Sequence, residues 1–158
     1  MTYSFELVNV KMEAVMTPEL LFRLANGFAL LGWLALIAGI VANRPWLRDK
    51  LAGLYWPLTL SVGYCAALSL GFGKSGGGFD TLPAVRQLFT NDWALLAGWV
   101  HYLAFDLFVG AWIARNAVEA GVSRWFMLPV LPVTFLFGPP GFLLFHIIKI
   151  FAARGAKS

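Results

Sequence analysis

Four long apolar runs, separated only by short polar segments, occupy most of this sequence. About 20 consecutive apolar residues are enough for a helix to cross the hydrocarbon core of a bilayer. Hydrophobic residues make up 59% of the chain and charged residues 13%, whereas soluble domains carry about 25% charged residues. The sequence therefore predicts an integral membrane protein and excludes an ordinary soluble domain, a disordered tail and a fibrous repeat.

The apolar runs predict an all-α integral membrane protein in which four transmembrane helices form one bundle. The expected spans are 18–42, 54–73, 93–117 and 126–151. Between the second and third spans, Phe79 to Phe89 have the pattern of a short amphipathic helix on the membrane surface. The fourth span should be kinked or partly unwound, because proline removes a backbone donor from a helix. Its prolines are Pro129, Pro132, Pro139 and Pro140.

These boundaries give an N-terminal extension over 1–16, a transmembrane domain over 17–151 and a basic tail over 152–158. Four spans put both termini on one side of the membrane. The Lys and Arg residues outside the spans are then shared almost equally between the two sides, so the positive-inside rule gives only a weak preference for a cytoplasmic turn at 44–50. The expected location is a bacterial inner membrane, or a plastid membrane for a plant or algal chain.

Few residues are suited to cofactor binding. Cys65 is the single cysteine, so an intrachain disulfide and a cysteine-based zinc or iron–sulfur site are excluded. The net charge of +4 is spread in small groups between apolar runs, and no basic stripe is present to bind nucleic acid. We expect no cofactor, no metal and no nucleic-acid partner.

Four polar side chains inside the spans need an explanation, because an intramembrane ionisable residue costs roughly 2.5–3.5 kcal/mol on insertion scales. They are Asn26, His101, Asp106 and His146. With a rise of about 1.5 Å per residue, Asn26 and His101 each lie about 12 Å into their spans, and His146 lies about 8 Å from the end of its own. Asp106 lies deeper, at the level of the 138–141 break. Alternating spans would therefore gather these groups in one half of the bundle.

The helical period predicts which face of the third span points toward lipid and which toward the other helices. The apolar side, which we expect to face lipid, carries Leu96, Val100, Leu103, Leu107 and Ala111. His101, Tyr102 and Asp106 fall on the opposite sector, where they would flank a pocket centred on Phe105. A carboxyl and an imidazole in such a pocket can act as general acid and base, so His101 and Asp106 are the candidate catalytic residues.

Other groups in this half of the bundle are candidates for substrate binding. The FGPPG segment leaves backbone carbonyls without donors. The candidate substrate-binding residues are Asn26, Tyr102, Phe105, Pro139, Gly141 and His146. The same polar groups also fit a purely structural role between helices. A bis-histidine haem on His101 and His146, or a divalent metal on these two with Asp106, is a weaker alternative.

The segments HYLAFDLFVGAW, 101–112, and PVLPVTFLFGPPGFLLFHIIK, 129–149, are similar to a family of small integral membrane proteins. It is the family of the plant abscisic-acid-deficient-four protein, also called neoxanthin-synthase-like. NDWALLAGWVHYLAFDLF and FGPPG carry the resemblance, and Asn26 fits the first span of the family. The resemblance covers about residues 17–150.

This resemblance implies a four-helix membrane protein and, in plants, a role in forming neoxanthin from violaxanthin. That reaction opens a carotenoid epoxide and removes a proton to give an allene. By resemblance, His101 and Asp106 match the intramembrane His and Asp of the family, and Pro139 and Gly141 match its kink.

Two classes of function follow. The first is an enzyme that isomerises a carotenoid or other isoprenoid lipid, which enters from the bilayer. The second is a non-enzymatic membrane scaffold or accessory subunit. A small proton-coupled exporter that uses Asp106 as its protonatable site is a third, weaker interpretation. The expected partner is a membrane lipid or carotenoid-like apolar ligand, and a homo-oligomer is compatible with each reading.

Overall fold

The computed structural model describes residues 16–155, with side chains up to Ala152, and every element in this range is a helix. The prediction of an all-α fold is therefore confirmed for the described part of the chain. The expected extension over 1–16 and basic tail over 152–158 lie largely outside the described residues.

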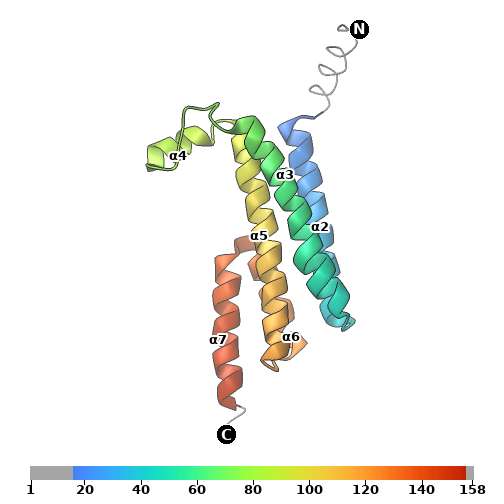
Figure 1. Cartoon of the computed structure of the whole chain (residues 1–158). Coiled ribbons are helices and arrows are strands. Elements are labelled where there is room, and N and C mark those ends of the chain that lie inside the picture. The colour runs from blue at the N-terminus through green and yellow to red at the C-terminus, as the bar shows by residue number, and fades with distance from the viewer. Residues whose placement is uncertain (1–15, 156–158) are drawn as a thin grey trace, which may run out of the picture.

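Three helical segments are long and apolar enough to cross a membrane. They are α2 (Pro18–Val41), the continuous pair η1 (Trp46–Tyr55) and α3 (Trp56–Gly71), and α5 (Asp92–Glu119). Figure 1 shows them side by side, with the start of α2, the end of α3 and the start of α5 at one end of the molecule. We call this end the upper end. The turn after α2 and the end of α5 lie at the opposite, lower end.

Local capping explains where the long helices begin. The Thr17 hydroxyl accepts a hydrogen bond from the Leu20 amide at 3.2 Å, directly before Pro18 in the first helical position. Asn91 caps α5 in the same way, because its side-chain oxygen accepts from the Trp93 amide at 3.0 Å. These side chains satisfy amides that have no partner within the first turn of a helix.

The central helix is α5, which packs against α2, α3, α6 and α7. Its buried face includes Leu96, Val100, Leu103, Leu107 and Ala111, together with Ile113 and several small residues. The first five of these residues were expected to face lipid, and that expectation is wrong. In a membrane protein the faces toward lipid and toward other helices are both apolar, so small residues, rather than polarity, mark the packed side.

The expected fourth span is not one helix. It is divided into α6 (Arg124–Phe137) and α7 (Pro139–Gly155), which meet at Gly138 with a φ of 59°. The two helices pack against each other as an antiparallel hairpin: a Cβ added to Gly141 would collide with Thr134, and Val130 and Phe145 share one core cluster. Figure 1 shows the hairpin in the lower half of the molecule, with its turn at mid-height of α5.

This hairpin changes the topology. Because α7 returns to the lower end, its last turn lies at the opposite end of the molecule from the start of α2 (Figure 1). The prediction of an all-α protein with several spans is therefore supported, but the described residues do not show the fourth continuous span that was expected. Within the described residues, three segments have the length of a span, and they are followed by a hairpin whose turn lies at mid-height of α5 in Figure 1.

The sequence of the turn explains the reversal. In a continuous helix, residues 139 and 140 would donate their amides to the carbonyls of Phe135 and Leu136. Both positions are proline, which has no amide hydrogen. Gly138 adopts a positive φ that other residues rarely adopt. Two lost hydrogen bonds next to this glycine end α6 and turn the chain back.

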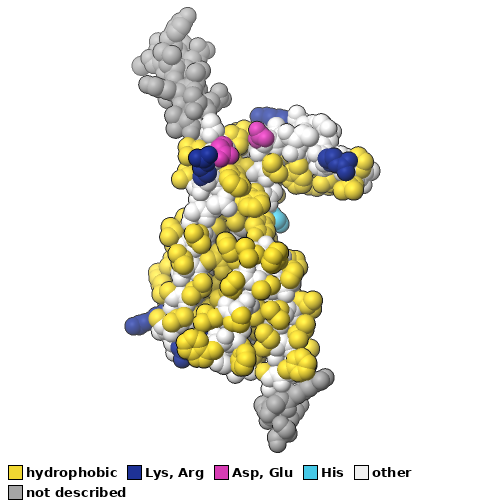
Figure 2. All heavy atoms as spheres, turned by 180° about the vertical axis from the view of Figure 1, so that it is seen from behind, with side chains coloured by type: hydrophobic (Ala, Val, Ile, Leu, Met, Phe, Trp, Pro, Cys, Tyr) yellow, Lys and Arg dark blue, Asp and Glu magenta, His cyan; other side chains and the backbone are white. Residues whose placement is uncertain are grey.

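The short helix expected between the second and third spans is α4 (Leu82–Leu88), which projects from the upper end in Figure 1. Its N-terminus is capped by the Thr81 hydroxyl, which accepts from the Ala84 amide at 3.2 Å. Figure 2 shows apolar side chains covering the body of the bundle, with acidic and basic side chains at its upper end and further basic side chains toward its lower end in this view. A broad apolar exterior of this kind is what lipid contact requires.

Candidate functional site

Asp106 of α5 lies directly against the turn of the α6–α7 hairpin. A Cβ added to Gly138 would stand 2.6 Å from Oδ1 of Asp106, so the carboxyl occupies the space that a side chain at 138 would need. Oδ2 of Asp106 is buried and has no hydrogen-bond partner. Buried polar atoms are nearly always paired, so this oxygen marks the position as a candidate site.

The prolines of the turn explain why this oxygen is unpaired. The first amides of a helix point away from its N-terminus and commonly bind a carboxylate or another anion. At the start of α7, the first two residues are Pro139 and Pro140, which have no amide hydrogen to donate. The start of α7 therefore donates no proline amide to the Asp106 carboxyl, which stays available for another donor.

Tyr102 lies one turn above Asp106 on α5. Its hydroxyl donates a hydrogen bond to the carbonyl oxygen of Phe135 at 2.6 Å. This carbonyl is one of the two that lose their intrahelical donor to the prolines, so Tyr102 replaces a missing backbone hydrogen bond. The contact ties the end of α6 to α5 and fixes the turn beside the carboxyl.

Asn26 of α2 and Trp99 of α5 continue this polar arrangement toward the upper end. The Trp99 indole donates to Oδ1 of Asn26 at 3.1 Å, and Nδ2 of Asn26 donates to the Phe22 carbonyl at 2.7 Å. The Trp99 and Tyr102 rings lie 5.2 Å apart. We call Asn26, Trp99, Tyr102 and Asp106 the polar seam.

A second unpaired polar atom lies just below the seam. The indole nitrogen of Trp33 is buried and has no partner. A Cβ on Gly110, one turn after Asp106, would stand 2.5 Å from the Trp33 ring, and this ring packs edge-on against Phe135 at 5.5 Å. One unpaired donor and one unpaired acceptor are therefore both buried around the end of α6.

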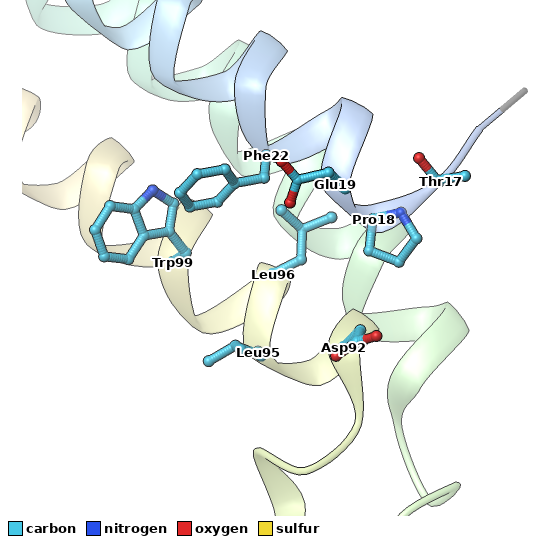
Figure 3. A pocket seen from close by; sticks show the side chains of 8 residues that line it. All are labelled: Thr17, Pro18, Glu19, Phe22, Asp92, Leu95, Leu96 and Trp99. Carbon is cyan, nitrogen blue, oxygen red and sulfur yellow. The ribbon is translucent and has the colours of Figure 1, made fainter.

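An open groove lies above the seam between α2 and α5. Its volume is about 640 Å³. Figure 3 shows side chains of the two helices facing each other across it, with the Phe22 and Trp99 rings adjacent at one end. The lining residues are Thr17, Pro18, Glu19, Phe22, Asp92, Leu95, Leu96 and Trp99. Trp99 therefore belongs both to the groove and to the seam, and Asp106 follows seven residues later, about 10 Å along the helix.

His101 lies on another face of α5. Its ring stacks on Phe105 at 4.6 Å and lies 5.5 Å from Tyr64 of α3. Phe105 is 53% exposed and lines a separate apolar groove between η1, α3 and α5, with a volume of about 240 Å³. The expected single pocket centred on Phe105 is therefore wrong: His101 and Phe105 face α3, whereas Tyr102 and Asp106 face the hairpin.

His146 is far below the seam. It stacks on Trp112 at 5.9 Å, and its Nδ1 lies 3.0 Å from the Phe142 carbonyl. Trp112 follows His101 by eleven residues, about 16 Å along α5. The expectation that the two histidines lie at similar depth in one half of the bundle is wrong, because the fourth run folds back. This separation is incompatible with one haem or one metal bound by both, and the described residues contain no group of three metal-ligating side chains.

The two remaining sequence candidates belong to the hairpin itself. Pro139 begins α7, and Gly141 packs against Thr134 so closely that no side chain would fit there. Sequence reasoning missed Trp33 and Trp99, because tryptophan in a span is usually read as packing or as an interfacial anchor. The available signal was that both indoles lie well inside their spans, where an N–H group needs a partner.

Comparison with known families identifies the family of this chain. A family model described as ABA DEFICIENT 4-like matches residues 20–145. The chain belongs to the ABA4-like family. The match runs from α2 into α7 and so includes the whole polar seam and the hairpin turn of this ABA4-like protein. Neither the curated proteins nor the solved structures give a match.

Gly138→Ala should destabilise this ABA4-like protein by about 1–3 kcal/mol, the usual cost of forcing a non-glycine residue into a rare backbone conformation. The added Cβ would also displace the Asp106 carboxyl. Unfolding followed in mild detergent measures the change. Gly27→Ala is the matched control, since no atom lies within 4 Å of its added Cβ and alanine favours a helix. Equal stability of the two variants would contradict the proposed role of Gly138.

Proposed function

We propose that this protein binds an oxygen-bearing isoprenoid lipid of the carotenoid type in the α2–α5 groove and isomerises it by acid–base catalysis at Asp106. The observation that carries this proposal is the buried, unpaired carboxyl oxygen of Asp106 beside the hairpin turn. Membership of the ABA4-like family supports the part of the proposal that makes this a membrane protein. The substrate and the reaction are our inference.

The groove has the chemistry expected for an amphiphilic lipid. Its walls are mainly apolar or aromatic, with Phe22, Leu95 and Leu96 between Thr17 at one end and Trp99 at the other. Hydrophobic clefts with a few convergent polar groups are typical of small-molecule sites. A ligand lying in the groove against Trp99 would extend its end toward Tyr102 and Asp106, which lie deeper along α5.

The reaction requires one group that both gives and takes a proton. In its protonated form, Asp106 would transfer its proton to the oxygen of a strained C–O bond, such as that of an epoxide. As this bond breaks, a neighbouring carbon loses a proton to the Asp106 carboxylate and a carbon–carbon double bond forms. The product has the same atoms as the substrate, and the carboxylic acid is regenerated.

The groups around Asp106 have supporting roles in this proposal. Tyr102, through its hydrogen bond to the Phe135 carbonyl, would hold the hairpin turn beside the carboxyl. The unpaired indole N–H of Trp33 would offer a donor to a polar group near the end of α6. We assign His101 no part in the proton transfer, because its ring stacks on Phe105 toward α3.

Purification from a carotenoid-producing bacterial host, in mild detergent, tests the binding part of the proposal. We expect a structured carotenoid absorption band in the purified protein, together with an isoprenoid lipid in its extract by mass spectrometry. A colourless protein that carries only bulk phospholipid would contradict binding. It would favour a non-enzymatic scaffold in which the seam only holds helices together.

Leu95→Trp should fill part of the groove and reduce the co-purified isoprenoid at least several-fold. Leu95 is 52% exposed and lines the groove, so a larger ring occupies ligand space without entering the protein core. Leu34→Trp is the matched control, because Leu34 is 53% exposed on α2 and lines none of the grooves described above. Quantitative lipid analysis of both variants gives the measurement. An equal loss in the control would contradict binding in this groove.

A further inference from the structure

The two ends of the bundle differ in charge once the hairpin is taken into account. Asp106 lies at mid-height and is counted with neither end. Among the other described side chains, six Lys and Arg residues and two acidic residues lie in the lower half of the bundle. Three Lys and Arg residues and three acidic residues lie toward the upper end. The lower basic residues are Arg44, Arg48, Lys50, Arg115, Arg124 and Lys149.

The lower basic residues include a set that is free to meet lipid headgroups. Arg48 is largely buried and paired with Asp49 at 2.7 Å, and Arg124 donates to the Val41 carbonyl at 3.1 Å. Arg44 is exposed in the turn before η1, and Lys50 is exposed within η1. Their charges therefore point out of the fold and are available to an external partner.

Among the described residues, the upper end has no comparable excess of basic side chains. Its Arg23 is paired with Glu19 at 2.8 Å. Lys74 and Arg86 are exposed, but two further acidic residues, Asp80 and Asp92, lie in the same region of the chain. The local charge is balanced and gives anionic lipid little reason to prefer this end.

We propose that the lower end of the bundle binds the anionic phospholipids of the cytoplasmic leaflet and that the upper end faces the opposite side of the membrane. Basic residues near the ends of spans are retained on the cytoplasmic side, and juxtamembrane basic residues are attracted to anionic headgroups. The hairpin is essential to this argument, because it places the end of α7 on the basic side. Four full spans would instead have left the basic charges almost equal on the two sides.

This orientation has a consequence for the groove. The α2–α5 groove lies toward the upper end, above the hairpin turn. It would therefore open toward the leaflet that faces away from the cytoplasm, and a lipid would enter from that leaflet. The orientation itself does not depend on the proposed isomerisation, since it rests on the charges and the topology alone.

Labelling in a bacterial host tests the orientation. Cys65 is replaced by serine, and single cysteines are introduced as Lys50→Cys and Lys74→Cys, each at an exposed position. A membrane-impermeant maleimide should label the Lys74→Cys protein in right-side-out vesicles and the Lys50→Cys protein only in inverted vesicles. The reverse pattern would overturn the proposal whether or not the protein is an isomerase.

A pair of matched double variants tests the lipid partner. In nanodiscs, phosphatidylglycerol added to phosphatidylcholine should raise the unfolding temperature of the native chain. Arg44→Gln with Lys50→Gln should remove more than half of this shift. Lys74→Gln with Arg86→Gln removes two charges that are also exposed, from the upper end, and should leave the shift unchanged. Equal losses in both pairs, or no shift in the native chain, would overturn the assignment of this surface.

Discussion

A cysteine introduced as Ala152→Cys should be labelled from the same side of the membrane as one introduced as Lys50→Cys. Ala152 is exposed near the end of α7, and Lys50 is exposed in η1 just after the turn at the lower end. Because the hairpin returns α7 to the lower end, both positions lie on one side (Figure 1). The expected effect is nearly complete labelling from one side and almost none from the other.

The control is a cysteine introduced as Lys74→Cys, which lies at the upper end and should show the opposite pattern in the same vesicles. All three proteins carry Cys65→Ser, since Cys65 is itself exposed on α3. If the cysteine at position 152 is labelled together with the one at position 74, the chain crosses the membrane four times and the hairpin is not present in the bilayer.

Asp106→Asn should reduce the proposed isomerisation by about 10²–10⁴-fold, the usual contribution of a general acid or base. The amide keeps the shape of the side chain beside Gly138, but it has no acidic proton to give to the substrate. The measurement compares carotenoid extracts of a host that expresses the native chain, the variant or no protein. The expected product has the mass of its substrate and a different retention time.

His101→Ala is the informative control for this measurement. We expect it to retain most of the activity, because the imidazole faces Phe105 and Tyr64 rather than the carboxyl. The unfolding temperature of each variant is measured alongside, so that loss of folding is separated from loss of chemistry. If Asp106→Asn unfolds the protein, and the carotenoid extract of the host with the native chain equals that of the host with no protein, the isomerase proposal is wrong. The carboxyl then has a structural role.

The boundaries of the first and third spans could be predicted closely from the sequence. The expected 18–42 corresponds to Pro18–Val41, and the expected 93–117 lies within Asp92–Glu119. Long apolar runs with a clear cap leave few alternatives in a bilayer, because every backbone amide must find a partner within the helix. The second span begins earlier than expected, since the π-helix η1 begins at Trp46 and continues directly into α3.

The reversal at Gly138 could not be predicted from hydropathy. Residues 126–151 are apolar throughout and long enough for a span, and Pro129 and Pro132 lie inside α6 without ending it. The difference at 138–140 is local: a glycine with positive φ is followed by two residues without amide hydrogens. Whether such a segment kinks or turns back depends on what packs against it, and here Asp106 and Tyr102 of α5 do so.

Only part of the candidate site could be predicted, because the reversal at Gly138 changes which side chains lie together. Asn26, Tyr102 and Asp106 do lie along one seam, because they share the side of the bundle where α2, α5 and α6 meet. His101 and His146 were grouped with them on the assumption of four full spans. Once α7 turns back, His146 moves toward the lower end, while His101 remains on the face toward α3.

The shallow hairpin also fixes an order of assembly. Its turn leaves the Phe135 carbonyl without an intrahelical donor, and backbone of this kind is tolerated at membrane depth only where protein covers it. The donor is Tyr102 of α5. The three long helices can therefore enter the bilayer first and independently, whereas α6 and α7 can reach their depth only after α5 is in position. The hairpin, which follows the three long helices along the chain, is thus the last of the described elements to fold, and the proposed site is completed only at that step.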